Sequence, residues 1–258
     1  MTKDLRIELE KGRGPQGMLL LHGLTGTPGE VLPLAEYLSR RSVRVLVPWL
    51  PGHGTNPSDL ARTHWTDWAQ TALQAYDHLA RRCRKVFVGG LSMGALLSLL
   101  VGLERPTAGV VSMAAPIDIQ DFRFRGLAFF RFFQWWTGQL RGGVRNPQGP
   151  VHVTYPTCPT SSLYEMKKLA DGVRARLGSF SRPLLILQGR RDSMVPPDNA
   201  ERLWALAGTP HKSLHYLDRS DHVLPLDYDQ AEVFHRVHRF LQTGGKARGT
   251  GKRFNGPV

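Results

Sequence analysis

Short apolar runs alternate with longer segments of helical period along most of this chain. The runs have strand length and are rich in β-branched residues, whereas the segments between them repeat apolar residues every three or four positions. This alternation predicts a mostly parallel sheet with helices on both faces. The expected strands are 18–21, 43–47, 86–89, 110–113, 184–188 and 214–217. The expected helices are 30–40, 65–81, 95–103, 200–206 and 230–241, with Asp198 as the N-cap of the fourth.

The chain has 258 residues, 41% of them apolar, which fits one large domain or two small ones and excludes disorder throughout. Its longest apolar stretches fall short of the roughly 18 to 20 residues that a membrane-spanning helix needs. The first residues carry charges where a secretion signal needs an apolar run, so we expect a cytoplasmic protein. Cys83 and Cys158 cannot form a disulfide framework and lack zinc-site spacing, so we expect both to be reduced.

The alternation breaks once, over more than 60 residues that show no clear strand. A gap of this length is an insertion, and we interpret it as a cap. Its first half holds six Phe and two Trp within residues 122–136, and a helical stretch follows at 163–176. The last 15 residues contain five Gly and no apolar period, which predicts a disordered tail. The expected division is a core of residues 1–115 and 183–243, a cap of residues 116–182 and a basic tail of residues 244–258.

The net charge of +13 is concentrated in the cap and the tail. The cap has ten basic and four acidic residues, and the tail adds four basic residues and no acid. We hypothesise that the basic, aromatic cap faces an anionic membrane surface. Two alternatives stay open: the charge serves solubility, and the rings form the small core of the cap itself. No motif that reads nucleic acid is present, so we do not expect a nucleic-acid partner.

The segment Gly90-Leu91-Ser92-Met93-Gly94 joins an expected strand to an expected helix in G-x-S-x-G spacing. A serine hydroxyl becomes a useful nucleophile when a sharp turn holds it out to a base, and small residues on both sides let strand and helix approach closely. The alternative is a tight glycine turn that only packs. We predict that Ser92 is a nucleophile.

The first parallel strand ends in His22-Gly23-Leu24. The backbone N–H groups of Leu24 and Met93 are expected to form an oxyanion hole, although a simple turn at the strand end is the alternative. We expect His22 itself to be a structural hydrogen-bonding residue.

Two later strands are followed by an acid and a histidine, Asp192 and His222. Ligands gather at the carboxyl ends of parallel strands, and the order Ser92, Asp192, His222 is that of a hydrolase triad. His222 is predicted to be the base, with Asp192 holding its tautomer. Asp118 is the competing acid, because it also follows a strand, whereas Asp221 is badly placed to orient the histidine next to it.

These residues make the chain resemble the α/β-hydrolase superfamily, and within it the small carboxylesterases and monoacylglycerol lipases, over residues from about 15 to 241. The resemblance implies a cap inserted between the sixth and seventh strands, and it places the oxyanion donors on Leu24 and Met93. The matching segments are His22-Gly23-Leu24-Thr25-Gly26, Pro51-Gly52-His53-Gly54, Gly90-Leu91-Ser92-Met93-Gly94, Gly189-Arg190-Arg191-Asp192 and Ser220-Asp221-His222.

The expected function is hydrolysis of a carboxylic ester, either a short- to medium-chain acyl ester or a monoacylglycerol, through an acyl-Ser92 intermediate. A thioesterase or an acyltransferase uses the same residues, and a ligand-binding protein without catalysis is a further alternative. The expected partner is a small-molecule acyl ester. No cofactor or metal motif is present, so none is expected.

Overall fold

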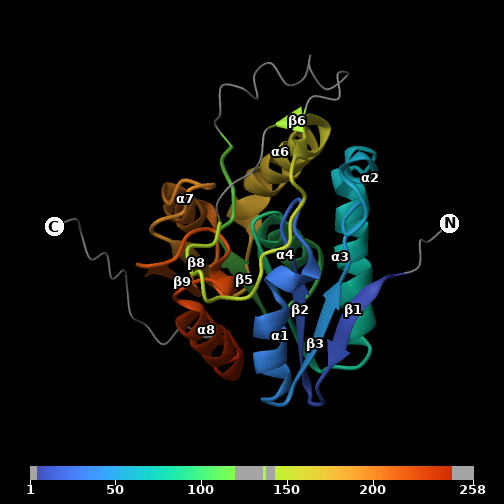
Figure 1. Ribbon diagram of the computed structural model, residues 1–258. Helices are drawn as coiled ribbons and strands as arrows, with labels where there is room; N and C mark the ends of the chain where they lie inside the picture. Colours follow the sequence, from blue (N-terminus) through green and yellow to red (C-terminus); the bar gives the residue numbers. More distant parts are fainter. Residues whose placement is uncertain (1–4, 120–135, 138–142, 246–258) are drawn as a thin grey trace.

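Six of the apolar runs form the parallel strands of one sheet in the computed structural model, which describes residues 5–119, 136–137 and 143–245. The sheet has the strand order β1-β3-β2-β4-β5-β8-β9 (Figure 1). Each predicted strand lies within an observed one, so these predictions are confirmed. The bounds are Gln16–Leu21 (β2), Val43–Pro48 (β3), Lys85–Leu91 (β4), Gly109–Met113 (β5), Leu184–Gly189 (β8) and Lys212–Leu217 (β9).

One strand of the sheet was not predicted. The strand β1 (Ile7–Lys11) pairs antiparallel with β3 at the edge of the sheet. Three of its five residues are charged and it is half-exposed, whereas the central strands are buried on both faces and read as continuous apolar runs. The alternation of Ile7 and Leu9 with charged residues was the available signal.

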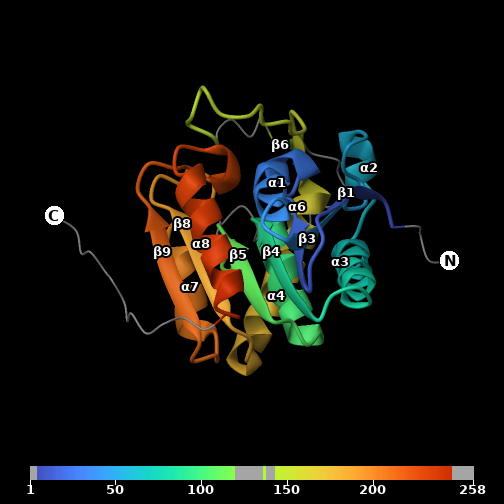
Figure 2. The same cartoon turned by 90° about the horizontal axis from the view of Figure 1, so that it is seen from below.

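Helices cover both faces of the sheet (Figure 2). The helices α1 and α8 pack on one face, and α3, α4 and α7 pack on the other. All five predicted helices are present, but Pro197, not Asp198, is the N-cap of α7, so that prediction was wrong. Asp198 is instead the first helical residue and pairs with Arg202. The bounds are Leu32–Ser39 (α1), Pro57–Ala61 (α2, not predicted), Trp65–Ala80 (α3), Met93–Glu104 (α4), Asp198–Leu206 (α7) and Gln230–Gln242 (α8).

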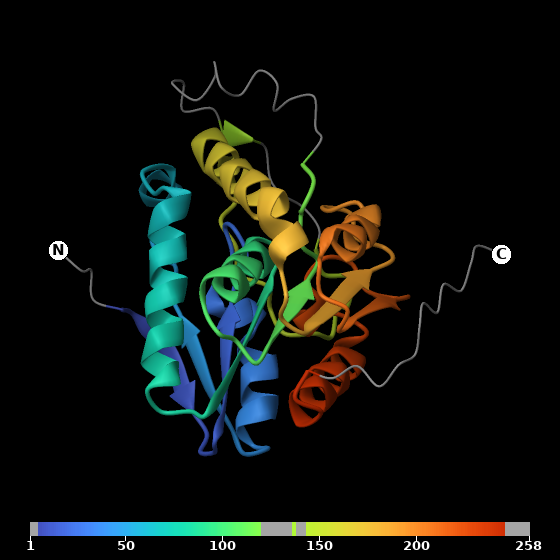
Figure 3. The ribbon, with the colours of Figure 1, turned by 180° about the vertical axis from the view of Figure 1, so that it is seen from behind.

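The segment between β5 and β8 contributes α6 (Thr160–Arg176), which contains the predicted stretch at 163–176. This helix packs against α4 and α3 (Figure 3). A short ladder also pairs β6 (Trp136–Thr137) with β7 (Cys158–Pro159). The insertion was predicted between the sixth and seventh strands, but it joins the fifth and sixth strands of this sheet, because only β1 precedes β2 in the chain. The cap boundaries stay a prediction, and most of the aromatic run, residues 120–135, lies outside the described residues.

Gly244 and Gly245 end the described part of the chain, so the predicted disorder of the remaining tail, 246–258, falls outside it. Within the described residues, no helix combines the length and the apolar character needed to cross a membrane. Cys83 and Cys158 are free thiols, and burial raises the pKa of Cys158 to about 12.

Candidate active site

Ser92 alone separates β4 from α4, and its backbone is strained. Its φ of 54° and ψ of −116° are a combination that residues with a side chain rarely adopt. Its backbone is held by hydrogen bonds: its N–H donates to the carbonyl of Met113 at 2.9 Å, and its own carbonyl accepts the N–H groups of Ala95 at 2.9 Å and Leu96 at 3.2 Å. The turn therefore sets Ser92 at the N-terminus of α4, where the helix dipole stabilises negative charge.

Two glycines make this turn possible. A Cβ on Gly94 would lie 2.2 Å from the carbonyl oxygen of Leu21, and a Cβ on Gly90 would lie 2.3 Å from the carbonyl oxygen of Gly94. Both obstacles are backbone atoms, which cannot rotate away as a side chain can. The strands β2 and β4 and the helix α4 meet here because neither glycine carries a side chain.

His222 and Asp192 form a buried pair at the carboxyl ends of β9 and β8. His222 Nδ1 lies 2.9 Å from Asp192 Oδ2, and the two residues are 3% and 9% exposed. Asp192 Oδ1 accepts the N–H groups of Met194 and Val195 at 2.9 and 2.8 Å. Burial raises the pKa of the Asp192 carboxyl, but the hydrogen bond and charge of His222 and these backbone donors outweigh burial, so its pKa lies below the usual value. An ionised Asp192 keeps the proton on Nδ1 and leaves Nε2 as the basic atom.

The other two candidate acids, Asp118 and Asp221, bind partners other than His222. The carboxylate of Asp118 accepts hydrogen bonds from Arg174, at 2.9 Å, and from Arg202. The carboxylate of Asp221 accepts both the N–H and the hydroxyl of Ser193. The structure therefore brings Asp192, and neither of these two, to His222.

Two polar residues that support this pair were not predicted from the sequence. Gln188 donates its side-chain N–H to Asp192 Oδ2 at 2.8 Å. The buried carboxylate of Asp227 accepts the N–H of Asp221 at 2.7 Å and that of Asn146 at 2.9 Å, which holds the loop carrying His222. Neither stands in a recognisable motif, and only the position of Asp227 shortly after the histidine hinted at its role.

The loop after β2 lies beside Ser92. A Cβ on Gly23 would be 3.5 Å from the Cβ of Ser92. Within the described part of the chain, neither the N–H of Leu24 nor that of Met93 donates a hydrogen bond. Met93 is the first residue of α4, where a backbone N–H has no partner inside the helix. The loop after β2 and the turn at Ser92 thus each offer one backbone N–H that has no partner among the described residues.

His22 is a structural residue, as the sequence suggested. Its Nε2 accepts the N–H of Leu50 at 3.2 Å, so its Nδ1 carries the proton and donates to the carbonyl of Gly23 at 3.0 Å. Burial, aided by the neighbouring His53, holds the pKa of His22 well below its usual value. Burial likewise lowers the pKa of His53 to about 4. Both rings are therefore neutral near pH 7.

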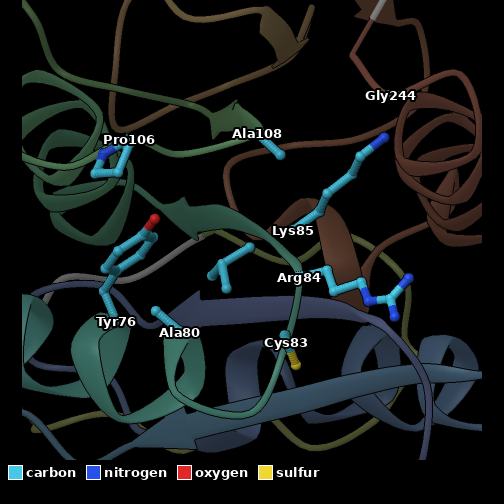
Figure 4. A pocket seen from close by; sticks show the side chains of 9 residues that line it. Tyr76, Ala80, Cys83, Arg84, Lys85, Pro106, Ala108 and Gly244 are labelled. Carbon is cyan, nitrogen blue, oxygen red and sulfur yellow. The ribbon is translucent and has the colours of Figure 1, made fainter.

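A surface hollow of about 460 Å³ lies at the opposite end of the sheet, around the amino ends of β4 and β5 (Figure 4). None of the predicted site residues lines it, so it has no part in the chemistry at Ser92. Its lining residues are Tyr76, Ala80, Cys83, Arg84, Lys85, Val86, Pro106, Ala108 and Gly244.

The parallel sheet, the strained turn after β4 and the acid–histidine pair after β8 and β9 define the fold as that of an α/β-hydrolase. The family model Hydrolase_4, described as serine aminopeptidase, S33, matches residues 15–229. The chain therefore belongs to this family of serine hydrolases.

Individual relatives agree with the family. The chain is 34% identical over 229 residues to a thermostable monoacylglycerol lipase of Bacillus sp. (strain H-257), covering 88% of this chain and 91% of the relative. It is 28% identical over 233 residues to a carboxylesterase of Bacillus subtilis (strain 168), covering 89% and 93%.

Solved structures show the same fold. A structure reported for the metagenome-derived lipolytic enzymes LipS and LipT has a TM-score of 0.86 at 29% identity, covering 91% of this chain and 96% of that one. The monoacylglycerol lipase of Paleococcus ferrophilus has a TM-score of 0.78 at 18% identity, covering 94% and 100%, and shows the fold alone. The predicted fold class and superfamily are confirmed.

Proposed function

We propose that Ser92, His222 and Asp192 form a catalytic triad with which this serine hydrolase cleaves carboxylic esters. The observation that carries the proposal is the buried Asp192–His222 pair, at the same edge of the sheet as the strained Ser92. His222 Nε2 accepts the hydroxyl proton while Ser92 Oγ forms a bond to the acyl carbon, and Asp192 stabilises the imidazolium that results. The carbonyl oxygen gains the electron pair and is bound by the N–H groups of Leu24 and Met93.

The tetrahedral intermediate then collapses to the acyl enzyme. The bond from the acyl carbon to the alcohol oxygen breaks, and the alcohol leaves with the proton held by His222. A water molecule next gives a proton to His222 and attacks the acyl carbon. The bond from the acyl carbon to Ser92 Oγ then breaks, His222 returns the proton to Oγ, and the carboxylic acid is released. The same two N–H groups stabilise both intermediates.

The proposed substrates are short- to medium-chain acyl esters or monoacylglycerols. Support comes from the relatives named as a monoacylglycerol lipase and a carboxylesterase, which match most of this chain. Hydrolysis of a thioester, or transfer of the acyl group to an acceptor other than water, would proceed through the same acyl-Ser92 intermediate. Measured rates therefore have to decide the substrate class.

An anionic membrane surface is the partner we propose for the cap. The described part of the cap supplies little free charge for it, because four cations of α6 have local acidic partners. The main support is the aromatic run, whose side chains lie outside the described residues, and the basic tail. The four pairs are Lys167–Asp171, Lys168–Glu165, Arg174–Asp118 and Arg176–Glu104.

The test is hydrolysis of p-nitrophenyl esters of short, medium and long acyl chains by the wild type and by Ser92→Ala. We expect kcat to fall by roughly a millionfold in Ser92→Ala, because a triad works as a unit. Ser39→Ala, at the end of α1, is the matched control and should behave as the wild type.

The same proteins are treated with a fluorophosphonate, which should label the wild type and the control but not Ser92→Ala. An active Ser92→Ala variant would refute the triad. A folded wild type that is inactive on every ester but active on the matching thioesters would show that the substrates are thioesters and not esters.

A further inference from the structure

The carboxylate of Glu30 lies buried beneath the loop that carries Leu24. Glu30 ends a short 3-10 turn (Pro28–Glu30) and is 4% exposed. Its Oε2 accepts the N–H of Gly23 at 2.7 Å. A Cβ on Gly26 would lie 2.1 Å from Oε1, so the loop wraps the carboxylate as closely as a glycine allows. The carboxylate therefore fixes the backbone immediately before Leu24.

The peptide that carries the Leu24 N–H is held by the same arrangement. Its carbonyl belongs to Gly23 and accepts a hydrogen bond from His22 Nδ1 at 3.0 Å. In a planar trans peptide the carbonyl and the N–H point in opposite directions, so the bond from His22 aims the N–H of Leu24 to the other side. Glu30 and His22 thus orient consecutive peptides of the loop.

The second oxygen of Glu30 reaches a distant part of the chain. Oε1 lies 2.8 Å from Nε2 of His152, within hydrogen-bond distance. His152 belongs to the segment that leads into α6, inside the predicted cap. One buried carboxylate therefore bridges the loop after β2 and this segment.

The neighbours of His152 bind the same loop. The carbonyl of Thr25 accepts the N–H of Tyr155 at 2.9 Å and the hydroxyl of Thr154 at 3.1 Å. Thr25 has a φ of 65°, a left-handed conformation that is unfavourable for a β-branched residue, so these bonds offset a local strain. The backbone on the far side of Leu24 is thus held by residues 154 and 155.

We propose that Glu30 is a positioning residue of the oxyanion hole and that its bond to His152 couples the hole to the segment preceding α6. This inference rests on the proposed function, since it concerns the same acyl-transfer step. Glu30 touches no reacting atom and acts through the peptides on either side of Gly23. A displaced Leu24 N–H weakens binding of the transition state more than binding of the ester, so the loss appears in kcat.

The experiment compares Glu30→Ala, Glu30→Gln and His152→Gln with two controls from α1 and α8, Glu36→Ala and His235→Gln. The readouts are kcat and KM on one short p-nitrophenyl ester, and the affinity for a trifluoromethyl ketone, whose adduct with Ser92 carries an oxyanion. We expect Glu30→Ala to lower kcat by at least about tenfold, towards the 10²- to 10³-fold loss that removal of a donor causes, with KM changed less than about threefold.

Affinity for the ketone should fall by the same factor as kcat/KM. Glu30→Gln keeps one acceptor oxygen, so its kcat should lie between those of Glu30→Ala and the wild type. His152→Gln should also lower kcat. Both controls should match the wild type. A folded Glu30→Ala variant with wild-type kcat, or with a loss confined to KM, would overturn the proposal.

If Glu30→Ala does not fold, then Glu30→Gln and His152→Gln decide, and wild-type kcat in both would equally overturn it. If the triad assignment itself is wrong, the result is a different one: the Ser92→Ala variant stays active.

Discussion

Nδ1 of His222 and Oδ2 of Asp192 are 2.9 Å apart although 30 positions separate the two residues in the chain. They meet because β8 and β9 are neighbouring parallel strands, so the loops that follow them leave the sheet at the same edge. Asp118 also follows a strand, but two arginines bind its carboxylate. This difference in partners leads to the first prediction.

Asp192→Asn should lower kcat by about 10⁴-fold, because an amide can donate to Nδ1 and so stabilise the wrong tautomer of His222. Asp118→Asn, the matched control, should keep kcat within about twofold of the wild type. Steady-state hydrolysis of a short p-nitrophenyl ester measures both. A large loss in Asp118→Asn with little change in Asp192→Asn would reverse the assignment.

Gly94→Ala should destabilise the protein by about 1–3 kcal/mol and abolish most activity, since the new methyl group meets the backbone oxygens of Leu21, at the end of β2, and of His22. Gly172→Ala is the control, because Gly172 lies in α6 with nothing within 4 Å of its would-be Cβ. It should stabilise the protein by about 1 kcal/mol through helix propensity. Urea unfolding monitored by circular dichroism checks both signs, and equal midpoints for the two variants would contradict the steric argument.

The stability of the protein should fall as the pH drops from about 6.5 towards 4. Burial holds the pKa of His22 well below its usual value and lowers those of His53 and His215 to about 4. In this window the unfolded chain binds protons that the folded protein does not, so the fully buried His22 and His53 each cost up to about 1.4 kcal/mol per pH unit and the partly exposed His215 costs less.

Urea midpoints at pH 7.5, 6 and 5 measure this slope. His215→Gln removes one of the three groups at a position away from Ser92 and should reduce the slope. Identical midpoints at pH 7.5 and pH 5 would show that these histidines titrate normally.

Binding to liposomes tests the membrane proposal. The wild type should co-sediment with anionic vesicles more than with neutral ones, and added salt should weaken the interaction. A chain ending at Gly245 separates the contribution of the tail from that of the cap. Equal binding to the two vesicle types, or none, would remove the anionic surface as a partner.

Predictions from the sequence were most accurate where a local pattern is compatible with only one kind of local structure. The five central strands are apolar because both of their faces are covered, and the spacing around Ser92 follows from the close approach of β2, β4 and α4. The strand β1 was missed because an edge strand needs only one apolar face. The sequence could not decide the role of the aromatic residues in the cap, since they suit a lipid-facing surface and a small core equally well.

The sequence alone determined the succession of strands and helices along the chain and the sharp turn at Ser92, because these depend on hydrophobic period and on glycines at fixed offsets. Tertiary structure decided which partners meet. Asp192 and Asp118 both follow a strand, and only the arrangement of the strands in the sheet, with β8 beside β9, shows which of them meets His222. The bridge from Glu30 to His152 spans 122 residues, and no local rule predicts a contact that depends on how the chain returns to the sheet.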